Sequence, residues 1–189
     1  MPDDSIRDQY VRYGAQGYYE QFGGQYRNPH ELAVRQAIHT AVASWELDLT
    51  HVLDLACGSG EVTLALRDEL AKQVRGAGAI DGLDPYTGAA YQARTGQAAE
   101  ALSFEAIAGG ALDGRHYSLV VCSYALHLLA LSRLPRLVYQ LSRVGDALLV
   151  LTPHKRPLLR AEWGWTLIGE MVVQRVRARC YQAGQHIDV

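Results

Sequence analysis

The residues with the clearest chemical potential lie between positions 52 and 63, where the sequence reads VLDLACGSGEVT. An apolar run is followed by Gly58 and Gly60 and then by residues typical of a helix. Glycine tolerates positive φ and lets the backbone approach a ligand closely, and the free amides at a helix start attract a carboxylate or phosphate. We therefore expect a ligand-binding loop between a strand and a helix. The alternative is a tight strand-to-helix turn that binds nothing.

Acidic residues around this loop indicate the kind of ligand. A dinucleotide fingerprint requires a third glycine, and Thr63 stands at that position, which weakens a pyrophosphate-binding interpretation. Asp54 lies near the end of the first apolar run, before the glycine loop, and Asp84 follows the next run, in IDGLDPY. A carboxylate at this second place can accept hydrogen bonds from both hydroxyls of a ribose, and it would repel a ribose 2′-phosphate.

The stretch VLDLACGSG resembles motif I of the class I S-adenosylmethionine-dependent methyltransferases, which have a Rossmann-like fold. That motif is an acid followed by small residues and glycines, a frame matched here by Asp54, Ala56, Gly58 and Gly60. The resemblance covers roughly residues 50–152. It implies that the loop, Cys57 included, holds the methionine part of S-adenosylmethionine and of its demethylated product, S-adenosylhomocysteine.

The same resemblance implies where the rest of the cofactor binds. Asp84 corresponds to the acid that binds the ribose, and Pro85 and Tyr86 would border the adenine. The family often has an acid after the third strand, but the sequence FEAIAGGAL has small residues there, so only backbone amides would reach the ring from Gly109, Gly110 and Ala111. The stretch 117–129 matches the fourth strand and its following loop, beside the transferred methyl group, with Cys122, Ser123 and Tyr124.

Candidates for the chemistry at the methyl group lie in two segments. His127 follows the fourth strand, where a histidine can deprotonate a hydroxyl or amine; its alternative role is to support the loop. The segment GYYEQFGGQYRN, residues 17–28, precedes the sheet, where related enzymes often place a lid. Aromatic faces suit a sulfonium cation, so we expect Tyr18, Tyr19 and Tyr26 to face the cofactor, and Tyr19 and Tyr26 to take part in catalysis. The alternative is packing onto the sheet.

The elements that must position these residues follow from the hydrophobic pattern. Apolar runs at 51–56, 79–83, 102–107, 117–123 and 147–152 alternate with helical stretches at 61–72, 87–99 and 131–144. This alternation predicts βαβ units. We therefore predict an α/β fold with a doubly wound, mostly parallel Rossmann-like sheet, helices on both faces and an antiparallel C-terminal edge strand or hairpin.

The C-terminal part is less regular and locally basic. Apolar residues alternate with arginines around 175–181, which predicts a strand with one solvated face, and 164–173 is either its hairpin partner, which we favour, or a short helix. His154 follows the fifth apolar run and is a candidate to face the substrate. The basic residues around it, which include Lys155, Arg156 and Arg160, form either a modest RNA-facing patch or a solvated surface.

The N-terminal part is predicted to be helical. Residues 5–22 are expected to form a helix or helical turn. A second helix is expected to be capped by Asn28, to begin at Pro29 and to use Glu31 in a capping box. We expect one domain over residues 1–189, with 1–48 as an N-terminal helical lid and 49–189 as the cofactor-binding α/β core.

Composition excludes several classes of protein. The chain has 189 residues, 49% hydrophobic and 20% charged, with a net charge of −2, which excludes disordered, collagen-like and coiled-coil proteins. No apolar run approaches the roughly 20 residues of a membrane span, and the N-terminal residues MPDDSIRDQY do not resemble a signal peptide. Three cysteines are too few for a disulfide framework or a zinc site. We expect a cytoplasmic protein with no metal.

Together these observations predict a S-adenosylmethionine-dependent methyltransferase that acts on a hydroxyl, amine or carboxyl group of a small-molecule acceptor. The near-neutral charge gives no general reason to expect a nucleic-acid or membrane partner, and nothing in the sequence indicates an oligomeric state. One alternative is a catalytically silent, cofactor-binding partner subunit of a methyltransferase complex. Another is a nicotinamide-dependent oxidoreductase, which Thr63 disfavours.

Overall fold

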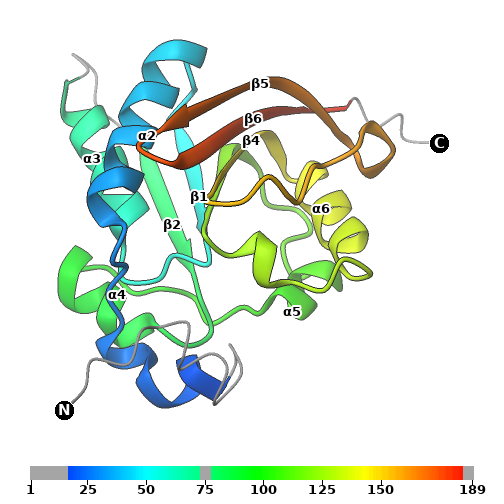
Figure 1. Ribbon diagram of the computed structural model, residues 1–189. Coiled ribbons are helices and arrows are strands. Elements are labelled where there is room, and N and C mark those ends of the chain that lie inside the picture. The colour runs from blue at the N-terminus through cyan, green and yellow to red at the C-terminus, as the bar shows by residue number, and fades with distance from the viewer. Residues whose placement is uncertain (1–16, 73–77, 185–189) are drawn as a thin grey trace.

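The computed structural model describes residues 17–72 and 78–184 (Figure 1). Within these residues, a six-stranded sheet has the order β2-β1-β3-β4-β6-β5. Its parallel part consists of β1 (His51–Leu55), β2 (Ala79–Leu83), β3 (Tyr117–Ser123) and β4 (Gly145–Thr152). The antiparallel hairpin of β5 (Trp165–Val173) and β6 (Val176–Ala183) adds to β4 through β6. The predicted α/β sheet with an antiparallel C-terminal hairpin is therefore confirmed.

Helices cover both faces of the sheet, as predicted (Figure 1). On one face, α2 (Glu31–Trp45) and α3 (Glu61–Lys72) bury their apolar sides against Leu119 and Leu149. On the other face, α6 (Leu134–Ser142) packs against Val120 and Leu148. Because successive strand residues point to opposite faces, the apolar runs of β3 and β4 supply both cores at once. Central strands buried on both sides have this pattern.

The remaining helices are short. α4 (Gly88–Thr95) follows β2, and α5 (Phe104–Ala108) lies between α4 and β3. Three short 3-10 helices, η1 (Gly23–Gln25), η2 (Leu126–Leu128) and η3 (Ala161–Trp163), occur within the described residues. No helix in 17–72 or 78–184 is long and apolar enough to cross a membrane.

The predicted strand at 102–107 is wrong. The segment forms α5 instead. Just before it, Glu100 forms an isolated β-bridge with Leu83, the last residue of β2, in the described structure. The Ser103 side chain caps the helix by accepting a hydrogen bond from the Ala106 amide at 3.2 Å. A short apolar run does not distinguish a strand from a helix, and here a good N-cap followed by alanines favours the helix. The sheet therefore ends at β2.

The start of α2 also differs from the prediction. The helix begins at Glu31 rather than Pro29, and its N-cap residue, His30, makes no side-chain cap hydrogen bond. Asn28 forms a turn instead, since its Oδ1 accepts from the His30 amide at 2.8 Å. Glu31 pairs with Arg94 rather than reaching back to the helix start. Upstream, residues 17–22 are helical, and the rest of the predicted 5–22 helix lies outside the described residues.

The predicted solvated face of β6 is largely covered. Arg179 is only 2% exposed and Tyr181 only 1% exposed, although both alternate with apolar residues in sequence. The segment after β4 passes over them: Leu159 donates its amide to the Tyr181 hydroxyl at 3.5 Å, and Arg179 binds backbone carbonyls of the same segment. Tertiary coverage thus overrides the amphipathic pattern.

Candidate functional site

A cavity of about 230 Å³ lies at the carboxyl ends of β1, β2 and β3. The structure brings to its wall the following residues that the sequence singled out: Tyr19, Tyr26, Ala56, Gly58, Asp84, Pro85, Tyr86, Ser123 and Tyr124. Three more lining residues belong to the stretch 117–129 that the sequence placed beside the methyl group, namely Ala125, Leu128 and Leu129. Sequence reasoning did not single out the others for the site: Asn28, Leu55, Leu102, Ser103, Phe104 and Glu105. Parallel strands place their carboxyl ends at one edge of the sheet, where open α/β folds bind ligands.

The glycine loop between β1 and α3 forms one side of the cavity. Gly58 has φ +55°, a conformation that side chains with a Cβ rarely adopt. A Cβ at this position would also come within 3.2 Å of the Tyr26 ring. Gly58 is therefore required both by the turn and by the close approach of the N-terminal segment. Gly60, in contrast, faces Thr95 of α4 and does not line the cavity.

Asp54 lies beneath the loop rather than on the cavity wall. Its side chain is fully buried, and Oδ2 accepts hydrogen bonds from the Thr63 amide at 3.1 Å and the Thr63 hydroxyl at 2.7 Å. Thus the residue that breaks the dinucleotide fingerprint is the partner of the motif's acid. Burial raises the pKa of the Asp54 carboxyl to about 7. Its other oxygen, Oδ1, has no hydrogen-bond partner among the described residues.

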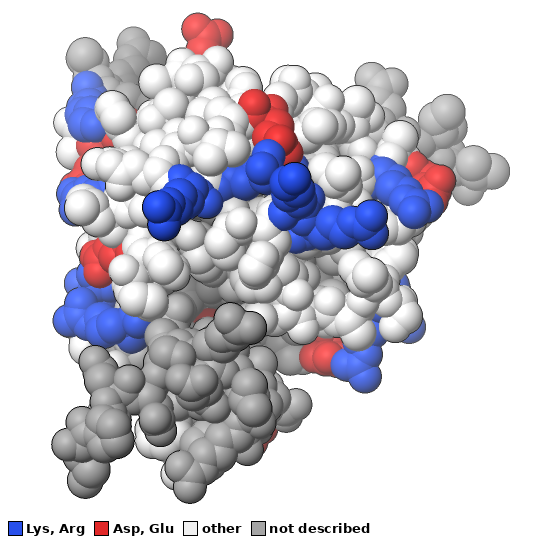
Figure 2. All heavy atoms as spheres, in the orientation of Figure 1, with Lys and Arg blue, Asp and Glu red and all other residues white. Residues whose placement is uncertain are grey.

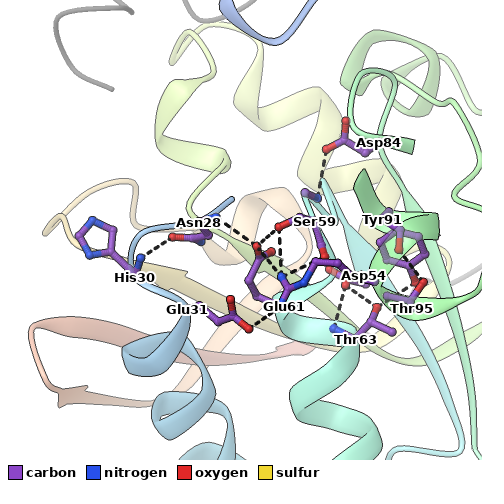
Figure 3. A network of polar contacts seen from close by, with 12 residues as sticks. Asn28, His30, Glu31, Asp54, Ser59, Glu61, Thr63, Asp84, Tyr91 and Thr95 are labelled. Atoms are coloured by element: carbon purple, nitrogen blue, oxygen red, sulfur yellow. Dashed lines mark hydrogen bonds and ion pairs between the residues drawn. The ribbon is translucent and has the colours of Figure 1, made fainter. Parts of the chain in front are cut away.

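Asp84 joins the end of β2 to the glycine loop. Its Oδ1 accepts from the amides of Tyr86 at 2.8 Å and Thr87 at 3.0 Å, which fixes the turn into α4. Its Oδ2 accepts from the Gly58 amide at 3.3 Å. Figure 3 shows this carboxylate above the loop, apart from the buried polar cluster around Asp54. The carboxylate therefore has a structural role in addition to its place on the cavity wall.

The N-terminal segment contributes an aromatic side to the cavity. The ring of Tyr19 lies 5.3 Å from that of Tyr26 and stacks on that of Tyr86 at 6.3 Å, measured between centroids. Tyr18, which the sequence also placed at the cofactor, is buried against Tyr19 and Phe22 and does not line the cavity.

A buried ionic network holds this segment to the glycine loop (Figure 3). Glu61, at the start of α3, is 5% exposed and accepts from the Asn28 amide at 3.2 Å and from the Ser59 hydroxyl. Arg94 of α4 pairs with Glu61 at 3.3 Å and also with Glu31 of α2. Apart from the contact between Ser59 and Glu61, each of these contacts joins residues at least 33 positions apart in the sequence. No local pattern therefore predicts the network.

His127 does not line the cavity. It belongs to η2, whose neighbouring residues Ala125 and Leu128 do line it. Its ring lies 6.4 Å from the Tyr124 ring and 4.7 Å from the His154 ring. Burial, with a smaller contribution from His154, lowers the pKa of His127 to about 4. Its Nδ1 is buried and has no hydrogen-bond partner among the described residues.

Several residues proposed for the cofactor are not brought to the cavity. Gly109, Gly110 and Ala111 lie at and beyond the end of α5, because the segment before them is a helix and not a strand. Ser103 and Phe104, at the start of that helix, face the cavity instead. Cys57 and Cys122 are buried behind the wall, and burial raises the pKa of both thiols. Across the described residues, no cluster of three or more His, Cys, Asp or Glu side chains is arranged to hold a metal ion.

Residues 52–146 match the family described as methyltransferase domain. An uncharacterized protein of Schizosaccharomyces pombe is 34% identical over 234 aligned positions, which cover 97% of this chain and 94% of that protein.

Solved structures show the same fold. Magnesium protoporphyrin IX methyltransferase from Synechocystis PCC 6803, with bound S-adenosylmethionine, has a TM-score of 0.60 at 15% identity and covers 97% of this chain and 98% of its own. An N-methyltransferase from Bradyrhizobium japonicum WM9, in complex with S-adenosylhomocysteine, has a TM-score of 0.61 at 12% identity, with coverage of 97% and 100%. At these identities the likeness is one of fold.

Proposed function

Since the chain belongs to the methyltransferase domain family, we propose that it transfers the methyl group of S-adenosylmethionine to a small-molecule acceptor. The observation that carries the proposal is the cavity at the carboxyl ends of β1–β3, where the glycine loop, the Asp84 carboxylate and two tyrosines of the N-terminal segment meet. Of the proposed site residues, nine line this cavity.

The residues present fit the chemistry of this cofactor. Its amino-acid end needs hydrogen-bonding groups, and the loop offers backbone groups at Ala56 and Gly58, with Asn28 opposite. Its ribose needs an acceptor for two hydroxyls, which the Asp84 carboxylate supplies. Its adenine needs flat apolar surroundings, and Tyr86, Phe104 and Leu102 are among the residues that line the cavity. We assign these residues to cofactor binding on this basis.

When bound, S-adenosylmethionine supplies a methyl group on a positively charged sulfur, which a nucleophile attacks in line. The chain's contribution is then mainly to position both reactants and to exclude water. Tyr19 and Tyr26 form an aromatic wall beside Gly58, and aromatic faces stabilise a cation. The network of Glu61 and Arg94 keeps the segment that carries these rings against the loop.

For an acceptor that arrives protonated, we propose His127 as the proton acceptor. Its pKa of about 4 keeps the imidazole neutral at pH 7, with a lone pair that can accept a proton, and makes it a weaker base than an ordinary histidine. Because His127 does not line the cavity, this role requires the acceptor or a water molecule to reach its ring past Tyr124, which does line it. An acceptor that is already deprotonated needs no base.

A small acceptor, with a hydroxyl, amine or carboxyl group as the nucleophile, is favoured by the limited volume of the cavity, about 230 Å³. Tyr19, Tyr26 and Asn28 of the N-terminal segment line this cavity.

Calorimetry tests the cofactor assignment directly. We expect S-adenosylhomocysteine to bind with micromolar or tighter affinity and NAD to show no binding. Binding of NAD alone would instead favour an oxidoreductase and refute the proposal. Release of S-adenosylhomocysteine from S-adenosylmethionine, measured across a panel of small acceptors, then tests methyl transfer.

One observation favours a second function, that of a partner subunit that binds the cofactor without catalysing transfer. Leu167, Ile168 and Val172 are 45–57% exposed on β5, the edge strand of the sheet. Exposed apolar groups at a sheet edge are typical of an interface. A monomeric protein in light scattering that transfers methyl groups by itself would exclude this alternative.

A further inference from the structure

A row of basic side chains crosses the face that carries the β5–β6 hairpin and the segment after β4 (Figure 2). Residues 153–179 contain six Lys or Arg and two Glu, a net charge of +4, whereas the whole chain carries −2. The rest of the chain therefore carries −6. Such segregation of charge in a nearly neutral protein creates a local positive field that attracts anions.

The acidic residues of this region do not neutralise the row. Glu170 pairs with Arg177 and with the buried Arg179, at 2.5 Å to the Nε of the latter, and Glu162 pairs with Arg160 at 3.1 Å. Lys155, Arg156 and Arg175 are exposed, and none of them forms an ion pair with a described residue. Three positive charges thus remain available to a ligand.

Lys155 and Arg156 belong to a backbone segment that hydrogen bonds from a buried side chain hold in place. The guanidinium of Arg179 donates to the carbonyl of Lys155 at 2.6 Å and to the carbonyl of Pro157 at 2.8 Å. Burying an arginine is costly unless it is fully paired, and here its pairing orders the loop that carries Lys155 and Arg156. A solvated surface loop would not require this arrangement.

The same loop begins beside the cavity. Ser123, which lines the cavity, is the register partner of Leu151 in β4, and the Tyr124 amide donates to the Leu151 carbonyl at 2.8 Å. Two residues beyond the end of β4, the His154 ring contacts His127, whose other ring contact is Tyr124 of the cavity wall. Lys155 and Arg156 follow immediately. The basic row therefore starts near the part of the cavity wall that Tyr124 forms.

We propose that the methyl acceptor is an anion, and that Lys155 and Arg156 bind its carboxylate or phosphate group while its nucleophile enters the cavity beside Tyr124. This inference rests on the proposed methyl-transfer function and adds the substrate class. The anionic group lies away from the reacting atom, so that the acceptor spans from the cavity to the loop after β4. Charge-assisted hydrogen bonds of this kind hold a small ligand in a fixed orientation.

The test uses the full-length protein saturated with S-adenosylhomocysteine. The probes are inorganic phosphate and matched pairs of a carboxylate and its uncharged amide, such as 4-hydroxybenzoate and 4-hydroxybenzamide. Backbone amide resonances in nuclear magnetic resonance spectra report affinity and place. We expect carboxylates to bind about tenfold more tightly than their amides, to shift the resonances of residues 154–156, and to weaken as salt rises.

The decisive variant is Lys155→Ala/Arg156→Ala, which should abolish the preference for carboxylates and leave S-adenosylhomocysteine affinity unchanged. The matched control is Arg35→Ala/Lys72→Ala, which removes the same charge from exposed positions of α2 and α3 and should keep the preference. A preference that survives in the first variant, equal affinity for acids and amides, or no binding by any anion would overturn the inference.

Two further outcomes distinguish a failure of the acceptor class from a failure of cofactor binding and from RNA binding. If S-adenosylhomocysteine itself does not bind, the proposed function fails, whereas normal cofactor binding without anion preference refutes only the acceptor class. A short single-stranded RNA that binds the row more tightly than every small anion, and does so without the cofactor, would assign the row to RNA and overturn the proposal.

Discussion

Replacing Asp84 by Asn removes one negative charge from the cavity wall while it keeps the shape of the side chain. The Asn oxygen can still accept from the amides of Tyr86 and Thr87, so the turn into α4 should persist. The Asn amide group cannot accept from Gly58, whose amide loses its bond of 3.3 Å. The substitution therefore separates cofactor binding from folding better than Asp84→Ala, which leaves all three amides without this acceptor.

The magnitudes follow from these contacts. A hydrogen bond to a charged group contributes about 1.5–3 kcal/mol. The long Gly58 contact, at 3.3 Å, belongs near the lower limit of that range, so the free energy of unfolding should fall by about 1–2 kcal/mol. For a chain of this length, that lowers Tm by about 2–8 °C. The loss of a charged acceptor for the ribose hydroxyls should weaken S-adenosylhomocysteine binding by about 1.5–3 kcal/mol, or about 10- to 150-fold.

Calorimetric titration of S-adenosylhomocysteine, with thermal unfolding of the same samples, measures both effects. The control is Asp81→Asn on the same strand, because the Asp81 carboxylate contacts His51 at 3.1 Å and does not line the cavity. That variant should bind the cofactor normally. A folded Asp84→Asn protein with unchanged Kd would refute the assignment of the ribose to this carboxylate.

The other predictions concern the loop, the network and the histidine. Gly58→Val should abolish cofactor binding in calorimetry. A branched side chain is strained at φ +55°, and its Cβ would lie only 3.2 Å from the Tyr26 ring. Normal affinity would show that the loop does not hold the cofactor. Arg94→Ala should lower the free energy of urea unfolding by about 3 kcal/mol, since it leaves the buried Glu61 carboxylate without its cation; an unchanged value would mean that the pair is not coupled to folding. For His127, the pKa of about 4 in the folded protein lies below the ordinary value of 6.5. Between these two pH values the unfolded chain binds more protons than the folded protein, so the free energy of unfolding decreases as pH falls from 6.5 to 4. His127→Gln should therefore lose less stability than the wild type between pH 6.5 and 4 in urea titrations, and parallel curves would contradict this.

Local sequence determined much of the framework of this protein. The run Val-Leu-Asp-Leu, the loop glycines and the apolar spacing of Glu61–Lys72 predicted β1, the loop and α3 in the places where they occur. These elements are specified by the nearest neighbours in the chain: period-two or helical apolar spacing decides which face is buried, and glycine decides where φ is positive. The same kind of alternation predicted β6, whereas for 164–173 the sequence left open the hairpin partner that we favoured and that the structure shows as β5, and a short helix.

Where the apolar pattern fitted both a strand and a helix, neighbouring residues decided which of the two formed. The run at 102–107 is apolar enough for a strand, but Ser103 caps a helix there. As a result, Phe104 reaches the cavity and Gly109 does not. The helix cap could be recognised in the sequence. Whether it stabilises this segment more than pairing with β2 would could not be predicted, because the pairing energy depends on the edge of β2, which exists only in the folded sheet.

The site itself depends on contacts between distant residues. Asp84 reaches back to Gly58, and Arg94 binds Glu31 and Glu61 on two other helices. Arg179 has the sequence context of a solvated strand residue, yet it is buried because the segment after β4 folds over it. Sequence periodicity describes which side of an element is apolar, whereas hydrogen bonds and ion pairs require atoms to meet at about 3 Å. Only the packing of the elements in three dimensions brings those atoms together. This packing places the glycine loop, which the sequence predicted, next to the other residues that line the cavity.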